Sequence, residues 1–167
     1  MNIRTLGFAT VLTAVLALLP ASASAETVVR RDARNDAPAG IDITRVAYAY
    51  SARRVAATVR VPELARTGRM GLSISRFEVF EAGYIAVVRR TSDGTVSARL
   101  LYYDHFDTTP RPCDVEGSWS RAAGAITVGV PVSCLRRHRT EQIYTSARTL
   151  RGERIDDAPA VRRLSRS

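Results

Sequence analysis

Apolar and polar residues alternate in short runs through the chain after residue 25, and Gly, Pro, Asp and Ser separate these runs. The clearest run covers residues 54–61, where Val55, Ala57, Val59 and Val61 fall on one side and polar or small residues fall on the other. A period of two is typical of β-strands with one buried face. The pattern therefore predicts strands and no amphipathic helix.

Further segments with strand character occur at intervals along the chain. They cover residues 27–31, 41–50, 70–80, 84–90, 95–103, 115–120, 125–130 and 142–147. Turn residues recur about every eight to twelve positions, a spacing that is typical of β-sandwiches. We expect an all-β protein with a single antiparallel β-sandwich of jelly-roll or immunoglobulin-like type and about eight or nine strands.

Two local features add detail to this expected sandwich. Ser92-Asp93-Gly94 lies between two β-prone runs, and Asp-Gly in such a position predicts a hairpin of the flanking strands. The run over residues 70–80 changes parity halfway along its length. A β-bulge near Ser75 or Arg76 would place the apolar residues of both halves on the same face.

Residues 1–25 have the features of a secretory signal peptide. A short positive start precedes an apolar stretch over residues 6–19, and Ala23-Ser24-Ala25 supplies the small side chains that a signal peptidase needs. The remaining chain would form a β-sandwich domain over residues 26–160 and a basic C-terminal tail over residues 161–167. This tail is expected to be frayed, and the alternative is that Val161 and Leu164 pair at a sheet edge. No later segment has the length and apolarity of a membrane-spanning helix, so we expect a secreted, extracellular protein.

The chain contains two cysteines, Cys113 and Cys134. An even number of cysteines in an exported protein most simply indicates a disulfide. This bridge would connect the loop before Trp119 to the segment after Val130. A cysteine nucleophile or a zinc site is disfavoured by the oxidising compartment.

The net charge is +9 at pH 7, and all 25 residues counted as Lys or Arg are arginines. Guanidinium groups form bidentate contacts with carboxylates and phosphates, so an anionic polymer is one explanation of this composition. A genome of high GC content would also encode arginine in place of lysine. Net charge influences non-specific association and solubility, and it does not define a binding site.

The motif Asp-Ala-Pro-Ala occurs twice, once at the end of residues 32–40 and once within residues 156–160. Calcium takes six to eight oxygen ligands at flexible spacing. If the two segments meet, a structural calcium site would draw on Asp32, Asn35, Asp36, Asp156 and Asp157. The alternative is that Asp, Asn and Pro build turns and nothing more; no other cofactor is expected.

His105 lies between Asp104 and Asp107, which is a position that a general base could occupy. A surface loop explains the same sequence. No Gly-x-Ser-x-Gly elbow, nucleotide fingerprint or phosphate-cradling glycine loop accompanies this histidine. We therefore expect no catalytic residues, and a small hydrolase using His105 is the alternative.

Aromatic and basic residues supply the candidate ligand contacts. Tyr102 and Tyr103 are consecutive in a predicted strand, so they point to opposite faces, and Tyr103 is the one available for stacking. Trp119 is expected to fill the core rather than to bind a ligand. Arg136, Arg137 and Arg139 are the arginines expected to contact an anionic partner at a rim of the sandwich, although solvation of loop ends predicts the same sequence.

Several short motifs follow one another in a characteristic order: an acid-rich loop, Asp-Ile-Thr-Arg-Val, Val-Arg-Val-Pro, Val-Pro-Val-Ser-Cys-Leu and a late Asp-Ala-Pro. In this order the chain resembles small secreted β-sandwich proteins of high-GC bacteria, and more loosely carbohydrate-binding modules and DOMON-like domains. The resemblance is carried by Asp36, Asp42, Ile43, Val46, Cys113, Pro131, Cys134, Leu135, Asp157 and Pro159. It implies a fold and an extracellular location, and it implies no activity and no haem ligand.

These observations favour a non-catalytic secreted binding module whose partner is an extracellular glycan or another anionic polymer or surface. We expect no specific nucleic acid partner. A protein-interaction or inhibitor domain, which would use an edge strand or an exposed apolar face, is the remaining alternative. The sequence leaves the oligomeric state open.

Overall fold

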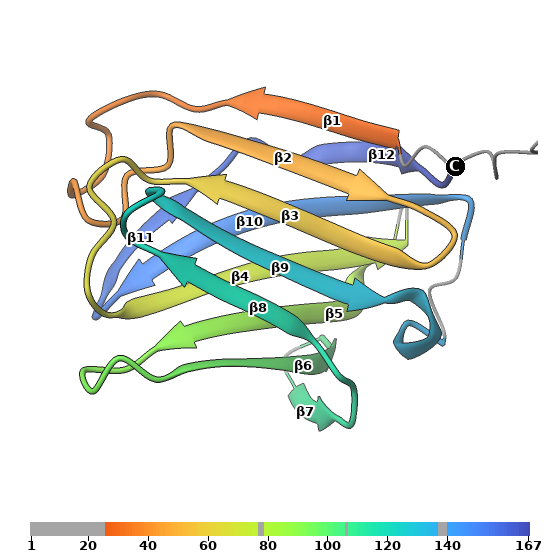
Figure 1. Cartoon of the computed structure of the whole chain (residues 1–167). Coiled ribbons are helices and arrows are strands. Elements are labelled where there is room, and N and C mark those ends of the chain that lie inside the picture. Colours follow the sequence, from red (N-terminus) through yellow and green to blue (C-terminus); the bar gives the residue numbers. More distant parts are fainter. Residues whose placement is uncertain (1–25, 77–78, 106, 137–139) are drawn as a thin grey trace, which may run out of the picture.

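The computed structural model describes residues 26–76, 79–105, 107–136 and 140–167, which form two antiparallel sheets packed face to face (Figure 1). The predicted signal peptide lies outside the described residues. One sheet has five strands in the order β1 (Glu26–Arg31), β2 (Arg45–Tyr50), β3 (Arg54–Arg60), β9 (Ala125–Pro131) and β8 (Glu116–Ser120). The other has seven: β11 (Arg154–Asp157), β10 (Gln142–Arg151), β4 (Gly68–Arg76), β5 (Val79–Arg90), β6 (Val96–Asp104) and β7 (Asp107–Arg111), with β12 (Val161–Ser165) also paired with β10.

The all-β, disulfide-linked sandwich predicted from the sequence is confirmed, but the strand count is not. The described residues form twelve strands instead of eight or nine. Two of the additional strands, β7 and β11, lie in segments expected to be a loop and a turn. All residues of β7 and all but one of β11 are exposed, so neither strand has a buried face that would produce alternation.

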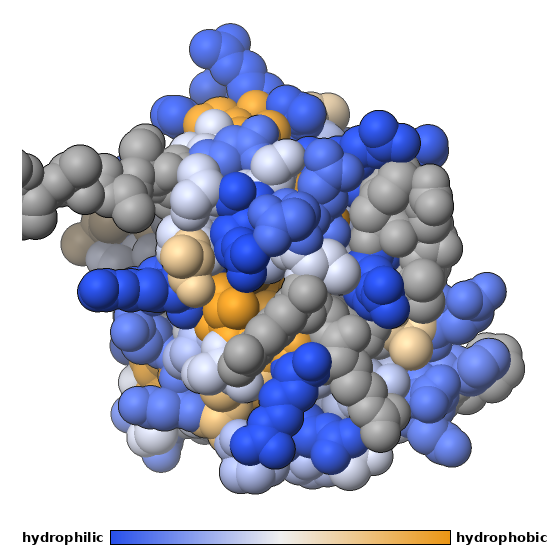
Figure 2. All heavy atoms as spheres, turned by 90° about the vertical axis from the view of Figure 1, so that its right-hand side faces the viewer, coloured by the Kyte–Doolittle hydropathy of each residue, from blue (hydrophilic) through white to orange (hydrophobic). Residues whose placement is uncertain are grey.

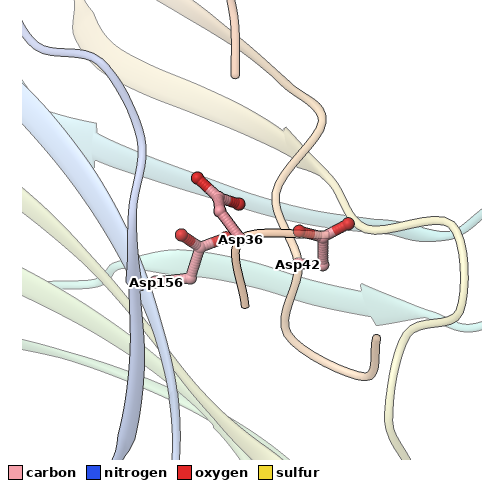
Figure 3. Close-up of side chains that lie close together, drawn as sticks. All are labelled: Asp36, Asp42 and Asp156. Carbon is pink, nitrogen blue, oxygen red and sulfur yellow. The ribbon is translucent and has the colours of Figure 1, made fainter. Parts of the chain in front are cut away.

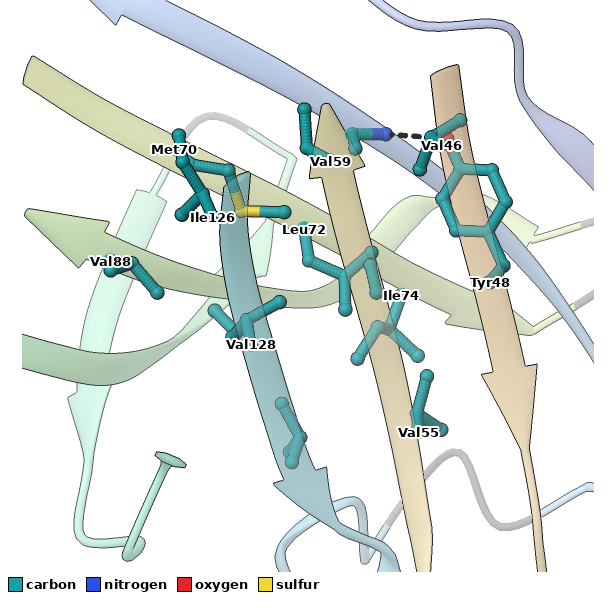
Figure 4. Close-up of a cluster of buried hydrophobic side chains, with 14 of the residues drawn as sticks. Val46, Tyr48, Val55, Val59, Met70, Leu72, Ile74, Val88, Ile126 and Val128 are labelled. Atoms are coloured by element: carbon teal, nitrogen blue, oxygen red, sulfur yellow. Dashed lines mark hydrogen bonds between the residues drawn. The ribbon is translucent and has the colours of Figure 1, made fainter. Parts of the chain in front are cut away.

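The core lies between the sheets and is built from the alternating positions. Val55, Ala57, Val59 and Val61 are at most 2% exposed, as predicted. They meet residues of β4 such as Leu72 from the facing sheet, and Figure 4 shows several of these side chains between the two layers.

The two predicted details of the large sheet are confirmed. β5 and β6 pair from Ala82 with Asp104 to Arg90 with Val96, around a turn in which Gly94 has a φ of 89°. A positive φ there is readily adopted by glycine. The register of β4 against β5 shifts between Ser75 and Arg76, where the bulge was expected.

The C-terminal segment is a strand, which is the alternative that the sequence left open beside a frayed tail. In β12, Val161 is 3% exposed and Leu164 is fully buried. Beyond this strand, the Arg166 amide donates to the Glu141 carbonyl at 2.8 Å. The sandwich therefore continues past residue 160, because two apolar side chains enter the core and the backbone pairs with β10.

The disulfide joins Cys113 and Cys134, with 5.9 Å between their Cα atoms. Cys113 precedes β8, and Cys134 lies in the short 3₁₀ helix η1 (Val132–Cys134) that follows β9. The bridge closes the open end of the β8–β9 hairpin, and a loop of this length corresponds to about 3 kcal/mol of stabilisation in the loop-closure model. In the same hairpin Trp119 is 7% exposed and its Nε1 donates to the Ala65 carbonyl at 3.0 Å, so its predicted core position is confirmed.

Tyr48 connects the two sheets at the edge of β10. Its Oη accepts a hydrogen bond from the Ala147 amide at 3.0 Å (Figure 4) and donates to the Pro159 carbonyl at 3.2 Å. Ala147 lies where the partner of β10 changes from β12 to β11. The phenol therefore takes the place of a ladder partner at this point.

Among the described residues, no helix is long and apolar enough to cross a membrane.

Candidate functional site

The two acidic segments predicted to converge do meet in the structure. Asp36 and Asp42 come from the loop between β1 and β2, and Asp156 comes from β11. One carboxylate oxygen of each lies within 4.8 Å of the others (Figure 3). Residues more than 100 positions apart in the chain thus form one acidic cluster, a name used below for these three residues.

Backbone hydrogen bonds hold the acidic cluster in place. The Ile43 amide donates to Asp156 Oδ2 at 2.6 Å, and the Asn35 amide donates to Asp42 Oδ1 at 3.1 Å and to Oδ2 at 3.2 Å. Asp42 and Asp156 are each 7% exposed, whereas Asp36 is exposed to solvent. Two carboxylates are therefore fixed by the fold, and the third closes the cluster from outside.

Burial and mutual repulsion raise pKa values around the acidic cluster. Burial raises the pKa of Asp156, and the negative charges of Asp36 and Asp42 raise it further against the hydrogen bond from Ile43. The pKa of neighbouring Asp32 is also raised, first by burial and then by these three carboxylates. Chemically, such a cluster can retain a proton or take up a cation through its carboxylate oxygens.

The structure brings together only part of the predicted calcium set. Asp36 and Asp156 belong to the cluster, and Asp32 lies close enough to be affected by its charge. Asn35 turns its backbone amide toward the cluster. Asp157 points to the other face of β11, where Arg148 donates to it through Nε at 2.8 Å and Nη2 at 3.2 Å.

Sequence reasoning missed Asp42 as a member of the cluster. Residues 41–50 were predicted to be one strand, but β2 begins at Arg45. Asp42 therefore lies in the loop, beside the buried residues Ile41 and Ile43. A carboxylate between two isoleucines is the one signal in the sequence for an anchored, buried acid.

A second charged surface covers one end of the outer face of the seven-stranded sheet. Arg69 of β4 is directly opposite Arg89 of β5. One row further along, Arg99 of β6 is opposite Val87, and Arg69, Arg89 and Arg99 line one groove of about 240 Å³ with Val87 and Ser97. We call these three arginines the basic face.

The charges of the basic face are not neutralised by neighbouring side chains. Among the described residues, Arg69, Arg89 and Arg99 take part in no ion pair. Arg148, on the same outer face, is paired with Asp157. Like charges directly opposite on neighbouring strands destabilise a sheet, so an external anion would relieve repulsion here.

Tyr103 lies on the same outer face as the basic face, and Tyr102 points inward, as predicted. Tyr102 is 8% exposed and packs edge-on against Tyr84, with 5.3 Å between the ring centroids. Tyr103 is half-buried, because it lies across Gly83: a Cβ at Gly83 would be 2.7 Å from the Tyr103 Oη. Part of this ring is therefore occupied by the sheet and part remains accessible.

The predicted arginine rim is at the other end of the molecule. Arg136 is exposed just after η1, and Figure 1 places η1 at the end opposite the β5–β6 turn. Arg137 and Arg139 lie outside the described residues. Seen from that end, hydrophilic side chains surround an apolar area (Figure 2).

His105 occupies the turn between β6 and β7, where its φ is 53°. Its Nδ1 lies 2.9 Å from Asp104 Oδ1, and the two side chains are 70% and 55% exposed. Asp107 is exposed at the start of β7. The local geometry is that of a hairpin turn carrying a solvated His–Asp pair.

Comparison of the chain with protein-family models, with curated proteins and with solved structures found no significant match.

Proposed function

We propose that the protein is a non-catalytic, exported binding module whose basic face holds an extracellular anionic polymer or surface, such as a glycan that carries acidic groups. The observation that carries this proposal is the direct cross-strand pair of Arg69 and Arg89, with Arg99 in the same groove and no ion-pair partner among the described residues. A cluster of guanidinium groups without ion-pair partners in the described part of the chain suits recognition of carboxylate, sulfate or phosphate.

The shape of the surface supports a polymeric ligand. Neighbouring strands lie roughly 4.8 Å apart, so the arginines on β4, β5 and β6 present charges on three adjacent strands, with Arg99 one row from Arg69 and Arg89. Tyr103, farther along the outer face, offers part of its ring for stacking against a sugar. The disulfide supports a location outside the cell.

The proposal keeps Tyr103 from the sequence-based prediction and moves the arginine contacts from the rim at Arg136 to the basic face. The rim and the basic face lie at opposite ends of the sandwich, so one experiment can separate them. Two double variants are compared, Arg89→Gln with Arg99→Gln and Arg136→Gln with Arg162→Gln. Each removes two positive charges from exposed positions.

Both variants and the wild type are eluted with salt from a sulfated-glycan column and from a phosphorylated-polymer column, after thermal unfolding has shown that they are folded. We expect the basic-face variant to elute at clearly lower salt and the Arg136/Arg162 variant to elute close to the wild type. Equal shifts in both variants would show that net charge alone explains retention and would refute the proposal.

A further inference from the structure

A cavity of about 370 Å³ opens at the end of the basic face, where β4 begins and β5 and β10 end. Figure 1 shows these three strand ends together at one end of the sandwich. Of the described residues, four arginines line it, Arg69, Arg89, Arg90 and Arg151, and no acidic residue does. Its volume is at the lower end of the range for small-ligand sites.

Strand register places the four arginines at the same end of the sheet. Arg69 is opposite Arg89 across β4 and β5, and opposite Leu150 across β4 and β10. Arg90 and Arg151 follow Arg89 and Leu150 in the chain. In the described part of the chain none of the four forms an ion pair.

Two carboxylates in the neighbouring turns, Asp93 and Glu153, form no ion pair with these arginines in the described part of the chain. The carboxylate of Asp93 accepts hydrogen bonds from Thr91 and from the amide and hydroxyl of Thr95, the latter two at 3.1 and 3.0 Å. Glu153 is exposed in the turn after Arg151 and makes no ion pair among the described residues.

Arg90 provides a second observation that points to a ligand. It occupies an inward position at the end of β5 and is half-buried, and its Nε is buried with no hydrogen-bond partner among the described residues. A buried donor on a charged group is costly when it has no acceptor. An oxyanion bound in the cavity would offer acceptor oxygens to the guanidinium groups of the arginines that line it, Arg90 included.

The floor of the cavity is firmly packed. Gly68 lines it, and a Cβ at Gly68 would be 3.0 Å from both the Leu150 carbonyl oxygen and Cη2 of the buried Trp119. The strands below the arginines are therefore in close contact, which favours a site with fixed geometry.

We propose that this cavity binds a tetrahedral oxyanion, the phosphate or sulfate ester group of an anionic polymer that continues onto the basic face. The inference deepens the proposed function and rests on it for the rest of the ligand, because the cavity and the groove of the basic face share Arg69 and Arg89. Several guanidinium groups around one compact site favour a group with multiple charged oxygens over a single carboxylate.

The direct test follows the arginine Nε–H resonances by NMR while inorganic phosphate, inorganic sulfate or chloride is added at constant ionic strength. We expect saturable shifts, the Arg90 Nε–H included, with phosphate or sulfate and none with chloride. Arg151→Gln, at an exposed position, and Arg90→Gln should each weaken phosphate or sulfate binding about tenfold. Arg136→Gln, at the opposite end, is the matched control and should leave binding unchanged.

Equal, non-saturable shifts with all three anions would overturn the inference, as would equal weakening by Arg151→Gln and Arg136→Gln. Sulfated, phosphorylated and carboxylate-only polymers then distinguish the source of the group, and preference for the carboxylate-only polymer would also contradict the inference. If phosphate and sulfate fail to bind while polymer retention still depends on Arg99, only this inference is wrong. If either oxyanion binds in the cavity while polymer retention follows net charge alone, only the proposed function is wrong.

Discussion

Tyr48 shows how a single polar atom can complete a sheet. On the side of β10 that faces β11 and β12, Ala147 lies between the two ladders, and the phenol oxygen arriving from the opposite sheet accepts its amide hydrogen. Tyr48 is fully buried, so water cannot replace the phenol. Burial also raises the pKa of this phenol well above its usual range, so it remains protonated and can donate to Pro159.

Replacing Tyr48 with Phe is expected to lower the free energy of unfolding by about 1–3 kcal/mol, because the Ala147 amide is left buried without an acceptor. Tyr50→Phe is the matched control. The Tyr50 hydroxyl donates to the Thr140 carbonyl at 2.6 Å, so its loss leaves no amide donor without an acceptor, and the cost should be about 1 kcal/mol or less. Urea denaturation measures both, and equal losses would contradict the role assigned to Tyr48.

The acidic cluster is expected to make stability depend on pH. The pKa values of Asp156 and Asp32 are higher in the folded protein than their ordinary values. In the pH range between the ordinary and the raised pKa values, the folded state therefore binds more protons than the unfolded state. The free energy of unfolding contributed by these groups therefore falls as pH rises from about 4 through the raised pKa values.

Asp36→Asn removes one of the repelling charges, so it should raise the midpoint of thermal unfolding at pH 7 and have less effect at pH 4. Asp107→Asn removes an equally exposed carboxylate from β7 and serves as the control for net charge. The explanation fails if the two variants gain the same stability, or if the gain from Asp36→Asn is independent of pH.

Calcium binding remains a prediction from the sequence. If a calcium ion uses Asp36 together with the buried carboxylates Asp42 and Asp156, calcium chloride should raise the unfolding midpoint of the wild type and EDTA should reverse the increase. The increase should be much smaller in Asp36→Asn. An unchanged midpoint in the wild type across a calcium titration would rule out a stabilising calcium site in this cluster.

At the scale of elements, alternation identified the strands that have one buried face. β3 has the burial pattern expected from its sequence, since every second side chain enters the core. β7 has no buried residue, and its backbone pairs with β6 without any alternation to reveal it. An exposed edge strand forms because it pairs with a neighbouring strand. A local pattern of apolar and polar residues carries no information about this pairing.

β12 was predicted only as an alternative to a frayed tail, for a different reason. Its two buried residues, Val161 and Leu164, are three positions apart, which breaks the period of two. In the structure Thr145 is opposite Val161 and Ile143 is opposite Leu164. A step of two residues along β10 therefore lies opposite a step of three residues along β12. This irregularity returns both side chains to the core, and only the pairing with β10 makes it visible.

Leu164→Ala tests whether β12 is part of the cooperative fold. Because Leu164 is fully buried, its truncation should lower the free energy of unfolding by about 2–5 kcal/mol. Arg162→Ala, at an exposed position of the same strand, should change it by less than about 0.5 kcal/mol. Chemical denaturation measures both variants, and a small effect of Leu164→Ala would restore the frayed tail predicted from the sequence.

At the scale of the whole molecule, the sequence predicted one of the two charged sites in part and did not predict the other. The repeated Asp-Ala-Pro-Ala motif was the basis for predicting that Asp36 and Asp156 converge. The basic face was not predicted, because it requires the pairing of β4 with β5 and of β5 with β6 to be known residue by residue. Arg69 in particular stands alone in the sequence and gains its neighbour only through register.

The sandwich carries the arginine-lined cavity and the acidic cluster at the same end, since the β1–β2 loop, the β5–β6 turn and the β10–β11 turn lie together there (Figure 1). Surface charges separated by more than a Debye length of about 8–10 Å are largely screened at moderate ionic strength. A net charge of +9 therefore acts at long range mainly at low salt, and short-range contacts must decide selectivity in physiological salt.

This difference in range leads to the last prediction, which concerns the salt dependence of polymer binding. A direct contact between arginine and an anionic polymer releases condensed counterions, so the logarithm of the affinity falls linearly with the logarithm of the salt concentration, by roughly 0.7–0.9 for each contact with a nucleic-acid phosphate. We expect a similar change for each contact with a densely charged glycan. Fluorescence anisotropy with a labelled sulfated glycan measures this slope.

If Arg89 and Arg99 contact the polymer, their double Gln variant should reduce the steepness of the slope by roughly 1.5. The Arg136/Arg162 double variant has the same net charge and should change the slope much less, because its charges act only through the screened field. A slope that changes equally in both variants would mean that the polymer has no fixed position on the sandwich. Binding would then reflect a diffuse positive surface, because only contacts at defined positions make the slope depend on which arginines are removed.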